Sequence, residues 1–327
     1  MVSIFRRKTL HAAAALSAAA LALPKAVAQS YPDKTVKIIV PYGTGTVSDW
    51  TARFFAKALN AAWGAPVVVE NMTGAGGVLG TQAIAKAVPD GYTLGVLASN
   101  HSMNAALYRN LSYDPVASFS PIIHTSFNQF AFCVNASLPV STLGEFIALA
   151  KAKPGEINFG SSGNGGSPHM AVEMLAYMAG IKLMHIPYRS NGAAVVDLVS
   201  GQVSLMSTSI SALLPHIKSG RIEALSVSGD TRSPLLPEVP TAAEAGVAGY
   251  NLKNWNGIVG PANLPAAIVS KVQNQVAAIL REKSTAEQFA AQGVEIEVMN
   301  SEGFGRRIQT EADYWRRVAA ASGVKVE

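Results

Sequence analysis

IIVPYGTGTVSDW, residues 38–50, joins an apolar run to a turn with two glycines, small hydroxyl residues and an aspartate, and a helical pattern begins at its last residue. The apolar run predicts a β-strand. A glycine-rich turn between a strand and a helix exposes backbone N–H groups at the positive end of the helix dipole, which suits an anion. The stretch therefore predicts an α/β fold with a site for a phosphate or a carboxylate after the first strand.

The alternation of strand and helix continues along the chain. VKIIV, PVVVEN and YTLGVLA form a first series of β-rich runs, and QFAFCVN, INFGSS, KLMHIPY, VSLMS and IEALSVS form a second. The helical patterns between these runs lie at residues 50–63, 80–87, 101–108, 142–152, 168–179 and 193–200. Alternation of this kind predicts parallel sheets flanked by helices. We expect two α/β units, with scaffold helices near residues 266–282 and 306–321.

The N-terminus has the features of an export signal. Arg6, Arg7 and Lys8 precede an uncharged run at residues 12–23, and Ala26-Val27-Ala28 supplies the small-x-small pattern of a signal-peptidase site. The apolar run is shorter than a membrane-spanning helix requires. We expect residues 1–28 to be removed, with cleavage near Ala28, and the mature protein to be exported. The arginine pair leaves both the ordinary secretory route and the twin-arginine route open.

Charge and cysteine content exclude several partners and sites. Residues 1–28 carry four basic residues and no acidic one, so their removal lowers the formal charge from +5 to +1. A chain this close to neutrality, with no basic cluster interleaved with aromatics, indicates no nucleic-acid partner. Cys133 is the only cysteine, which excludes an internal disulfide. The histidines show no metal-binding spacing, so we expect no metal.

Two catalytic patterns are weak or missing. Gly43 and Gly45 fit the start of a dinucleotide-binding G-x-G-x-x-G motif, but Ser48 occupies the third glycine position. The nucleophile-elbow pattern G-x-S-x-G does not occur in the sequence. We therefore expect no cofactor, and these patterns give no support for nucleophilic catalysis.

Each α/β unit contains one loop that suits an anion. PYGTGTVSD, residues 41–49, lies in the first unit, and GSSGNGGSPH, residues 160–169, lies in the second. If the two helix N-termini point to one cleft, their N–H and hydroxyl groups can bind a carboxylate from both sides. The alternative is that both are ordinary strand-to-helix turns. His169 fits either ligand contact or local packing at the start of its helix.

Six segments of the chain resemble one family. They are YPDKTVKIIVPYGTGTVSDWTAR, VVVENMTGAGGVLGTQAIAKAVPDGYTL, LSYDPVASFSPI, INFGSSGNGGSPHMAVEML, HIPYRSNGAAVVDLVSGQV and TRSPLLPEVPTAAEAG. Together they are similar to the Bug family, the extracytoplasmic solute-binding receptors of tripartite tricarboxylate transporters, also called the TctC family. The resemblance runs in order over essentially the whole mature chain.

The resemblance implies a fold and a role. The fold is the α/β type II periplasmic-binding fold, or Venus flytrap, with two lobes that are each a mostly parallel sheet flanked by helices. We place lobe 1 at residues 29–127 and 231–327 and lobe 2 at residues 128–230. The implied role is capture of a small organic carboxylate between the lobes and its delivery to membrane transporter subunits, by a monomer without enzymatic activity. An exported ligand sensor, or an exported hydrolase or isomerase on the same scaffold, remains the alternative.

The resemblance also implies the site, which combines the two glycine-rich loops with positions near the cleft. The expected ligand-binding residues are Tyr42, Gly43, Thr44, Gly45, Thr46, Ser48, Asp49, Ser99, Asn100, Ser161, Ser162, Gly163, Asn164, Gly165, Gly166, Ser167, His169, Tyr188 and Thr208. We expect Thr46 and Ser162 to bind one carboxylate from opposite lobes. Thr208 stands where the family usually has an aspartate, so a ligand ammonium would lose a partner there. This change favours a plain or hydroxylated carboxylate over an amino acid.

The export hypothesis predicts the first residue of the mature protein. Cleavage after Ala28 leaves Gln29 at the N-terminus of the protein that accumulates in the periplasmic fraction. N-terminal sequencing of that fraction measures it directly. Accumulated protein that begins at Met1 or Val2 would show that no signal peptide is removed.

Overall fold

The computed structural model describes residues 31–108 and 110–322, so the predicted signal peptide lies outside the described residues. The chain divides into two compact units between Asp33 and Lys34, and the fold below is that of the unit from Lys34 onward. None of the helices within the described ranges is long and apolar enough to cross a membrane.

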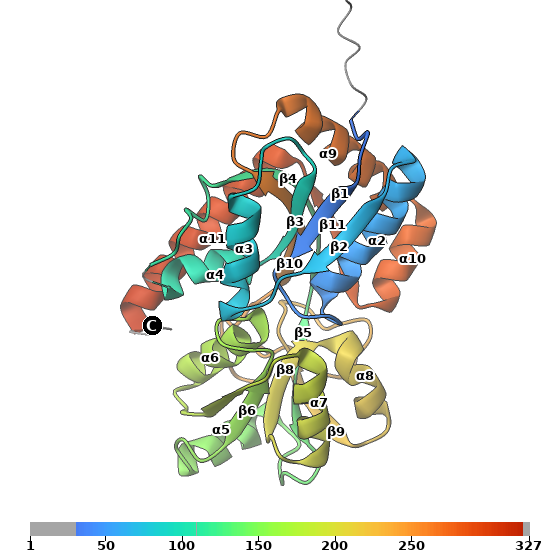
Figure 1. Cartoon of the computed structure of the whole chain (residues 1–327). Coiled ribbons are helices and arrows are strands. Elements are labelled where there is room, and N and C mark those ends of the chain that lie inside the picture. The colour runs from blue at the N-terminus through green and yellow to red at the C-terminus, as the bar shows by residue number, and fades with distance from the viewer. Residues whose placement is uncertain (1–30, 109, 323–327) are drawn as a thin grey trace, which may run out of the picture. The chain divides into compact units, whose positions relative to one another are not determined.

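The first sheet has six strands in the order β2-β1-β3-β10-β4-β11 (Figure 1). Its strands are β1 (Val36–Val40), β2 (Val67–Asn71), β3 (Thr93–Ala98), β4 (Phe119–Asn128), β10 (Asn254–Pro261) and β11 (Val294–Met299). β2, β1 and β3 pair in parallel, whereas β10 is antiparallel to both of its neighbours, β3 and β4. β11 closes the edge antiparallel to β4.

The second sheet has five strands in the order β7-β6-β8-β5-β9. Its strands are β5 (Phe130–Asn135), β6 (Asn158–Ser161), β7 (Met184–Pro187), β8 (Leu205–Ser209) and β9 (Ile222–Val227). β7, β6 and β8 are parallel neighbours, and β5 is antiparallel to both β8 and β9. The expected α/β class with two helix-flanked sheets is confirmed. Both sheets are mixed, however, and not mostly parallel as expected, because the pairs formed by β10, β4 and β11 in the first sheet and by β5 in the second are antiparallel.

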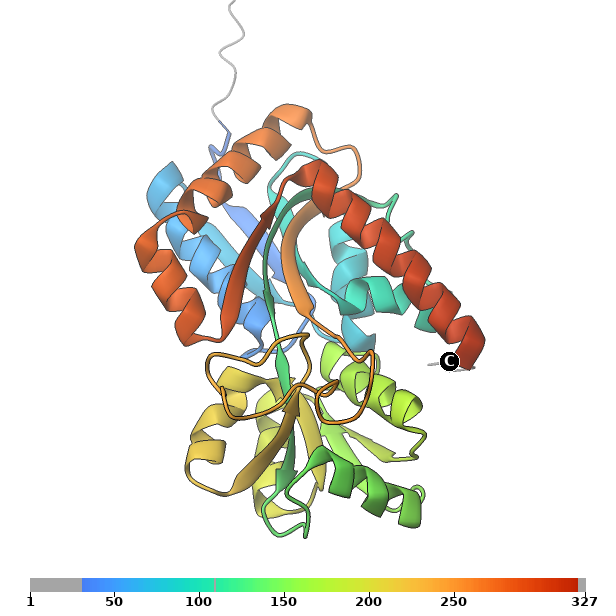
Figure 2. The ribbon, with the colours of Figure 1, turned by 180° about the vertical axis from the view of Figure 1, so that it is seen from behind.

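The antiparallel strands have a physical reason. The chain leaves the first sheet at the end of β4 and enters the second as β5, and it returns from β9 to β10 (Figure 2). A chain that goes out and comes back at one place must run in opposite directions there. β4 therefore pairs antiparallel with β10, with Asn128 opposite Asn254, and β5 pairs antiparallel with β9.

Helices cover both sheets (Figures 1 and 2). Those of the first lobe are α2 (Val47–Trp63), the 3-10 turn η1 (Ala75–Gly77), α3 (Val78–Ala85), α4 (Asn100–Leu107), α9 (Ala266–Leu280), α10 (Lys283–Ala291) and α11 (Ser301–Ser322). Those of the second lobe are α5 (Leu143–Ala152), α6 (Ser167–Ala179), α7 (Asn191–Ser200) and α8 (Ile210–Lys218). α5 and α6 pack in one core with Phe132 and Phe159, and α7 and α8 pack in another with Ala131 and Cys133. The two helix pairs thus cover opposite faces of the second sheet.

Several helices begin earlier than their apolar pattern predicts. α2 begins at Val47 instead of Trp50, because the Thr46 hydroxyl accepts a hydrogen bond from Asp49 N and caps the helix. α7 begins at Asn191 instead of Ala193, after the cap residue Ser190. A cap residue is polar and precedes the apolar face, so periodicity alone places the start too late.

The lobe boundaries stay a prediction, and the core contacts bear on the second one. β4 ends at Asn128 and β5 begins at Phe130, close to the expected first boundary. The expected return at residue 231 precedes a stretch in which Leu236 packs in the core of α7 and α8 and the Tyr250 ring lies 5.6 Å from the ring of Phe132 in β5. The Tyr250 hydroxyl also donates to Ala171 O in α6, at 2.9 Å. We therefore propose that the chain returns to the first lobe near Lys253.

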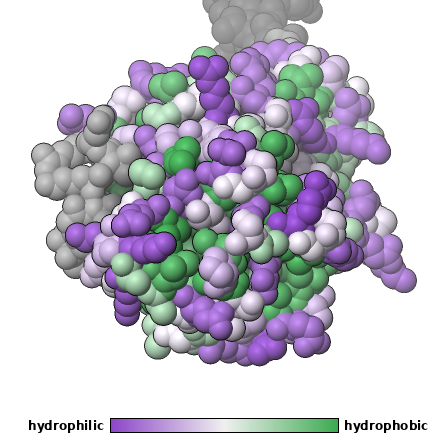
Figure 3. All heavy atoms as spheres, turned by 90° about the horizontal axis from the view of Figure 1, so that it is seen from below, coloured by the Kyte–Doolittle hydropathy of each residue, from purple (hydrophilic) through white to green (hydrophobic). Residues whose placement is uncertain are grey.

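The surface of the second lobe is mixed in character. Its exposed large apolar side chains include Tyr177, Met184 and Val196. Figure 3 shows hydrophobic residues interspersed with hydrophilic ones on the end of this lobe.

Two buried histidines predict a loss of stability in acid. Burial lowers the pKa of His101 and of His124 to about 4, from an ordinary value of 6.5. Between these pH values the unfolded chain binds protons that the folded chain does not, so stability is lost as the pH falls through this range. Near pH 4 the loss in the free energy of unfolding reaches about 3 kcal/mol for each histidine. Urea denaturation at a series of pH values measures the slope.

A single substitution tests whether His101 contributes to this dependence of the unfolding free energy on pH. His101 contacts Pro115 O through Nε2 at 2.7 Å, and a glutamine at this position keeps a donor for that carbonyl. His101→Gln should therefore reduce the pH dependence. An unfolding free energy that stays constant from neutral pH to about pH 4 would contradict the prediction.

Candidate functional site

A cavity of about 410 Å³ lies between the two lobes. Its lining combines the ends of β-strands, glycine-rich loops and the first residues of helices. The lining residues are Pro41, Tyr42, Gly43, Thr46, Val47, Ser48, Thr73, Gly74, Ala75, Gly76, Gly77, Ala98, Asn100, Asn128, Phe130, Ser162, Gly163, Asn164, Gly166, Ser167, Pro168, Tyr188, Arg189, Asn191, Thr208, Ser209 and Asn254. This set contains no aspartate or glutamate.

Six helices begin at this cavity. The cap residue or the first residue of α2, α3, α4, α6, α7 and α8 belongs to the lining. The parallel strands explain why these helices begin together. Parallel strands of one sheet end at the same edge, and the helix that follows each strand begins near that edge. Every such helix directs the positive end of its dipole toward the cavity.

Four of these helix starts lack a side-chain cap in the described structure. Gly77 at α3, Ser99 at α4, Gly166 at α6 and Ser209 at α8 make no side-chain capping hydrogen bond. At α3 the preceding 3-10 turn supplies acceptors, because Val78 N donates to Ala75 O and Leu79 N to Gly74 O. The first-turn N–H groups of α4, α6 and α8 remain for solvent or a ligand to satisfy. An anion in the cavity would interact favourably with each terminus by roughly 0.3–1 kcal/mol.

The first glycine-rich loop is held by contacts within its own lobe. Thr46 lines the cavity, but its hydroxyl donates to Gly43 O at 2.9 Å while it accepts from Asp49 N at 3.2 Å. The hydroxyl proton expected to bind a carboxylate is therefore already used in the loop. The Asp49 carboxylate accepts hydrogen bonds from Gly45 N, from Arg53 Nε and from Asn71 Nδ2. Asp49 thus fastens the loop and does not line the cavity.

The second glycine-rich loop rests on two stacked histidines. His169 and His185 have ring centroids 3.9 Å apart. Gly165 N donates to His169 Nδ1 at 3.0 Å, and the Ser161 hydroxyl lies 2.7 Å from His185 Nε2. Burial, with the neighbouring His169, lowers the pKa of His185 to about 4. The conformation of the loop is therefore supported by Ser161, Gly165 and His169, which lie outside the cavity lining. Ser162 lines the cavity.

A third loop, Thr73–Gly77, contacts the second lobe directly. Gly76 has φ +61°, and its carbonyl accepts from Asn100 Nδ2 at 2.6 Å and from Asn104 Nδ2 at 3.1 Å. A Cβ at this position would stand 2.5 Å from Asn164 O in the second lobe. Only a glycine fits where the two lobes touch.

Comparison with known proteins identifies the family. The model of the tripartite tricarboxylate transporter family receptor, TctC, matches residues 51–324. The chain belongs to this receptor family. BugT of Bordetella pertussis is 32% identical over 314 residues, which cover 95% of this chain and 96% of BugT.

Two solved structures have the same fold as this TctC receptor. Rpa4515 of R. palustris, solved with adipate, has a TM-score of 0.84 at 31% identity and covers 90% of this chain and 98% of its own. MatC from Rhodopseudomonas palustris, solved with bound malate, has a TM-score of 0.83 at 28% identity and covers 88% of this chain and 99% of its own. These likenesses confirm the periplasmic-binding fold and the relation to the Bug receptors.

The structure brings most of the expected site residues of this TctC receptor together. Those that line the cavity are Tyr42, Gly43, Thr46, Ser48, Asn100, Ser162, Gly163, Asn164, Gly166, Ser167, Tyr188 and Thr208. Those outside the lining are Thr44, Gly45, Asp49, Ser99, Ser161, Gly165 and His169. The second group lies in or beside the same loops, and most of its members hold those loops in place.

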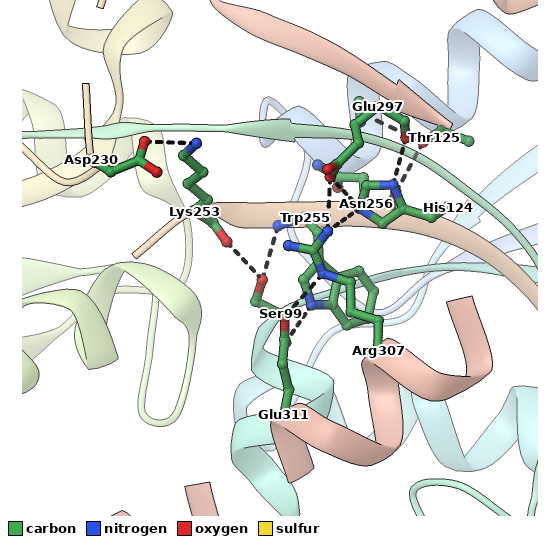
Figure 4. Close-up of polar contacts among 11 residues, drawn as sticks. Ser99, His124, Thr125, Asp230, Lys253, Trp255, Asn256, Glu297, Arg307 and Glu311 are labelled. Carbon is green, nitrogen blue, oxygen red and sulfur yellow. Dashed lines mark hydrogen bonds and ion pairs between the residues drawn. The ribbon is translucent and has the colours of Figure 1, made fainter. Parts of the chain in front are cut away.

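Ser99 shows how such a residue serves the site from outside it (Figure 4). Its hydroxyl accepts from Trp255 N at 2.9 Å and donates to Lys253 O at 3.3 Å. Lys253 Nζ is paired with Asp230 at 2.7 Å, and Trp255 Nε1 donates to Glu311. Ser99 therefore fixes the place where the returning chain enters β10.

Sequence reasoning missed three groups of lining residues. The loop Thr73–Gly77 and the pair Arg189 and Asn191 each follow a strand and precede a helix, so the rule used for the first two loops would have found them. Asn128 and Asn254 lie opposite each other in the β4–β10 pair, and Asn254 Nδ2 donates to Asn128 Oδ1 at 3.0 Å. Their proximity depends on a long-range strand pairing that no local pattern reveals.

The contact at Gly76 gives a testable prediction. Gly76→Ala should oppose closure of the lobes, because the new Cβ would overlap Asn164 O. Isothermal titration should show that the affinity for the receptor's ligand falls about tenfold or more, which corresponds to about 1.4 kcal/mol or more of binding free energy. Small-angle scattering should show a larger radius of gyration for the liganded variant.

Gly220→Ala is the matched control. Gly220 has φ +69° and has no atom within 4 Å of a Cβ at its position, so alanine there brings the same backbone strain without the contact. If both variants bind as tightly as the wild type, contact at Gly76 does not limit closure.

Proposed function

We propose that this protein is a periplasmic receptor that binds a small organic carboxylate between its lobes. The observation that carries the proposal is the convergence of the uncapped N-termini of α4, α6 and α8 on a cavity without a described acidic side chain. Such a cavity attracts an anion, and charge-assisted hydrogen bonds from N–H groups contribute about 1.5–3 kcal/mol each. A few of them are enough for micromolar affinity, about 8 kcal/mol.

The lining also bears on the class of anion. Thr208 is buried, lines the cavity and donates to Asn191 Oδ1 at 2.9 Å. A ligand ammonium would find no carboxylate among the described lining residues, so an amino acid fits poorly. The relatives solved with adipate and with malate support a carboxylate for this chain as well.

Membership of the TctC family supports delivery to a transporter. A ligand held by loops of both lobes favours the closed arrangement, and closure changes the surface that a partner meets. We propose that the partner is the membrane part of a tripartite tricarboxylate transporter, as the name of the family implies. A signalling protein could instead be the partner, and it would recognise the same closed arrangement with the ligand bound in the same cavity.

The lining residues favour binding over catalysis. Those that titrate are Tyr42, Tyr188 and Arg189. Burial raises the pKa of Tyr42, and burial together with Asp197 raises the pKa of Tyr188 to about 12. Both phenols therefore stay protonated at neutral pH. Among the described lining residues there is no histidine, cysteine or carboxylate to act as a general base.

A thermal-shift screen of the mature protein tests this function. The panel contains mono-, di- and tricarboxylates, inorganic phosphate and amino acids. A ligand at a hundredfold excess over its dissociation constant adds about 2.7 kcal/mol of stability, which raises the melting temperature measurably. Stabilisation by amino acids or phosphate alone would contradict a carboxylate receptor, and turnover of a stabilising compound would favour the enzyme.

Substitution of Ser162, in the second glycine-rich loop, is the most direct test of ligand binding in this cavity. Ser162 lines the cavity, and its hydroxyl has no hydrogen-bond partner among the described residues. Ser162→Ala should lower the affinity for the stabilising carboxylate about tenfold or more and leave the melting temperature of the free protein unchanged.

Thr46→Val should instead lower the free energy of unfolding by about 0.5–2 kcal/mol, because it removes the cap of α2. Ser284→Ala, an exposed position on α10, is the control.

A further inference from the structure

We infer that Asn104 and Tyr108, two residues of the first lobe, are positioning residues for the second glycine-rich loop, which belongs to the second lobe. Asn104 lies on α4, and Tyr108 directly follows that helix. Figure 1 shows α4 at the end of the first lobe that faces the second. Neither residue belongs to the cavity lining, whereas Ser162 and other residues of the loop do. The inference rests on the proposed function, because it assigns further residues to the same site.

Asn104 is almost fully buried where loops of the two lobes meet. Its Nδ2 donates to Gly76 O of the third loop at 3.1 Å, and Asn100 Nδ2 donates to the same carbonyl at 2.6 Å. Because a carbonyl can only accept, this contact decides which amide atom of Asn104 is the nitrogen. The other amide atom, Oδ1, lies 3.4 Å from where a Cβ on Gly165 of the second loop would stand.

Tyr108 lies close to the same glycine. Its hydroxyl oxygen is 3.1 Å, and its Cε2 is 3.3 Å, from where a Cβ on Gly165 would stand. Gly165 has φ +72°, in the left-handed region that favours glycine, and its N–H donates to His169 Nδ1 at 3.0 Å. The second loop is thus supported by His169 within its own lobe and by Asn104 and Tyr108 from the other lobe.

The third loop connects these contacts to the cavity. Gly76 lines the cavity, and a Cβ there would stand 2.5 Å from Asn164 O of the second loop. Asn164 lines the cavity as well. Since α4 holds the carbonyl of Gly76, a shift of Asn104 would move both loops at the place where they meet. The N–H and hydroxyl groups that the second loop offers to a ligand therefore depend on contacts that the first lobe supplies.

The residue type at position 104 supports a role beyond packing. Asn104 Oδ1 is buried and has no hydrogen-bond partner among the described residues. Burial of an amide oxygen without a partner costs free energy, and a leucine of similar size would avoid that cost. An asparagine is explained instead by the two loops that its amide contacts.

Hydrogen–deuterium exchange of the free mature protein tests the inference without a ligand. Asn104→Ala should speed the exchange of backbone N–H groups in residues 160–169 by about 2- to 10-fold, the range that corresponds to loss of one neutral hydrogen bond. Tyr108→Leu should have an effect in the same direction. Tyr108 is half-buried, so this second variant decides the question even if Asn104→Ala does not fold.

Isothermal titration with adipate, malate and succinate gives a second readout. Both variants should weaken the binding of each probe that wild type binds by about 2- to 10-fold. The factors should agree within about twofold from probe to probe, because neither residue lines the cavity. A residue that contacts the ligand would instead change the ratio of affinities between the probes.

Asn135→Ala is the matched control. Asn135 is also a buried asparagine whose amide donates to backbone carbonyls, those of Leu198 and Val199. It lies at the end of β5 opposite to Phe130, which lines the cavity. Asn135→Ala should lower the free energy of unfolding and leave both the exchange of residues 160–169 and the affinities unchanged.

Two results would overturn the inference. One is exchange at the wild-type rate in residues 160–169 of a folded Asn104→Ala or Tyr108→Leu variant. The other is an equal increase in Asn135→Ala, because general destabilisation would then be sufficient. If wild type binds no carboxylate, the proposed function fails, and the exchange rates still decide whether the first lobe positions the loop.

Discussion

The first turn of an α-helix leaves backbone N–H groups without partners inside the helix, and a folded protein must supply acceptors for them. In this receptor the strands of both sheets deliver helix starts to a common cavity, and four of those starts have no acceptor from a side chain in the described structure. At α3 the preceding 3-10 turn supplies the acceptors, whereas α4, α6 and α8 still need them, which suits the cavity to an anion. The fold and the candidate function are therefore two consequences of one arrangement of hydrogen bonds.

The crossing strands connect the two lobes beside this cavity. β4 passes to β5 through a single residue, Gln129, while the return from β9 to β10 takes a longer path that packs in the second lobe. Asn128 and Asn254 sit at the ends of the crossing strands and also line the cavity. A ligand that contacts these side chains contacts the segments about which the lobes would move.

Local sequence patterns predicted what depends on local structure. The two glycine-rich loops were found because each follows an apolar run and precedes a helix, and VKIIV forms β1 as expected. The starts of α2 and α7 were placed two or three residues late because caps are polar. Pairing of β4 with β10 joins segments more than a hundred residues apart, and no periodicity encodes it. The roles of Thr46 and Asp49 were also hidden, because a residue type does not reveal whether a hydroxyl or carboxylate faces a cavity or its own loop.

One apolar cluster extends through both lobes. Met103 and Leu107 of α4 and Trp315 of α11 are buried together with Met170 and Leu175 of α6. Any motion that separates α4 from α6 would expose this surface to water, at about 25 cal/mol for each Å². Burial of this surface therefore favours the arrangement in which the lobes are together, and a ligand that contacts both lobes would spend less of its binding energy on holding them there. The same burial would make the empty and the loaded receptor more alike in shape, and a partner that recognises closure would have less difference by which to tell them apart.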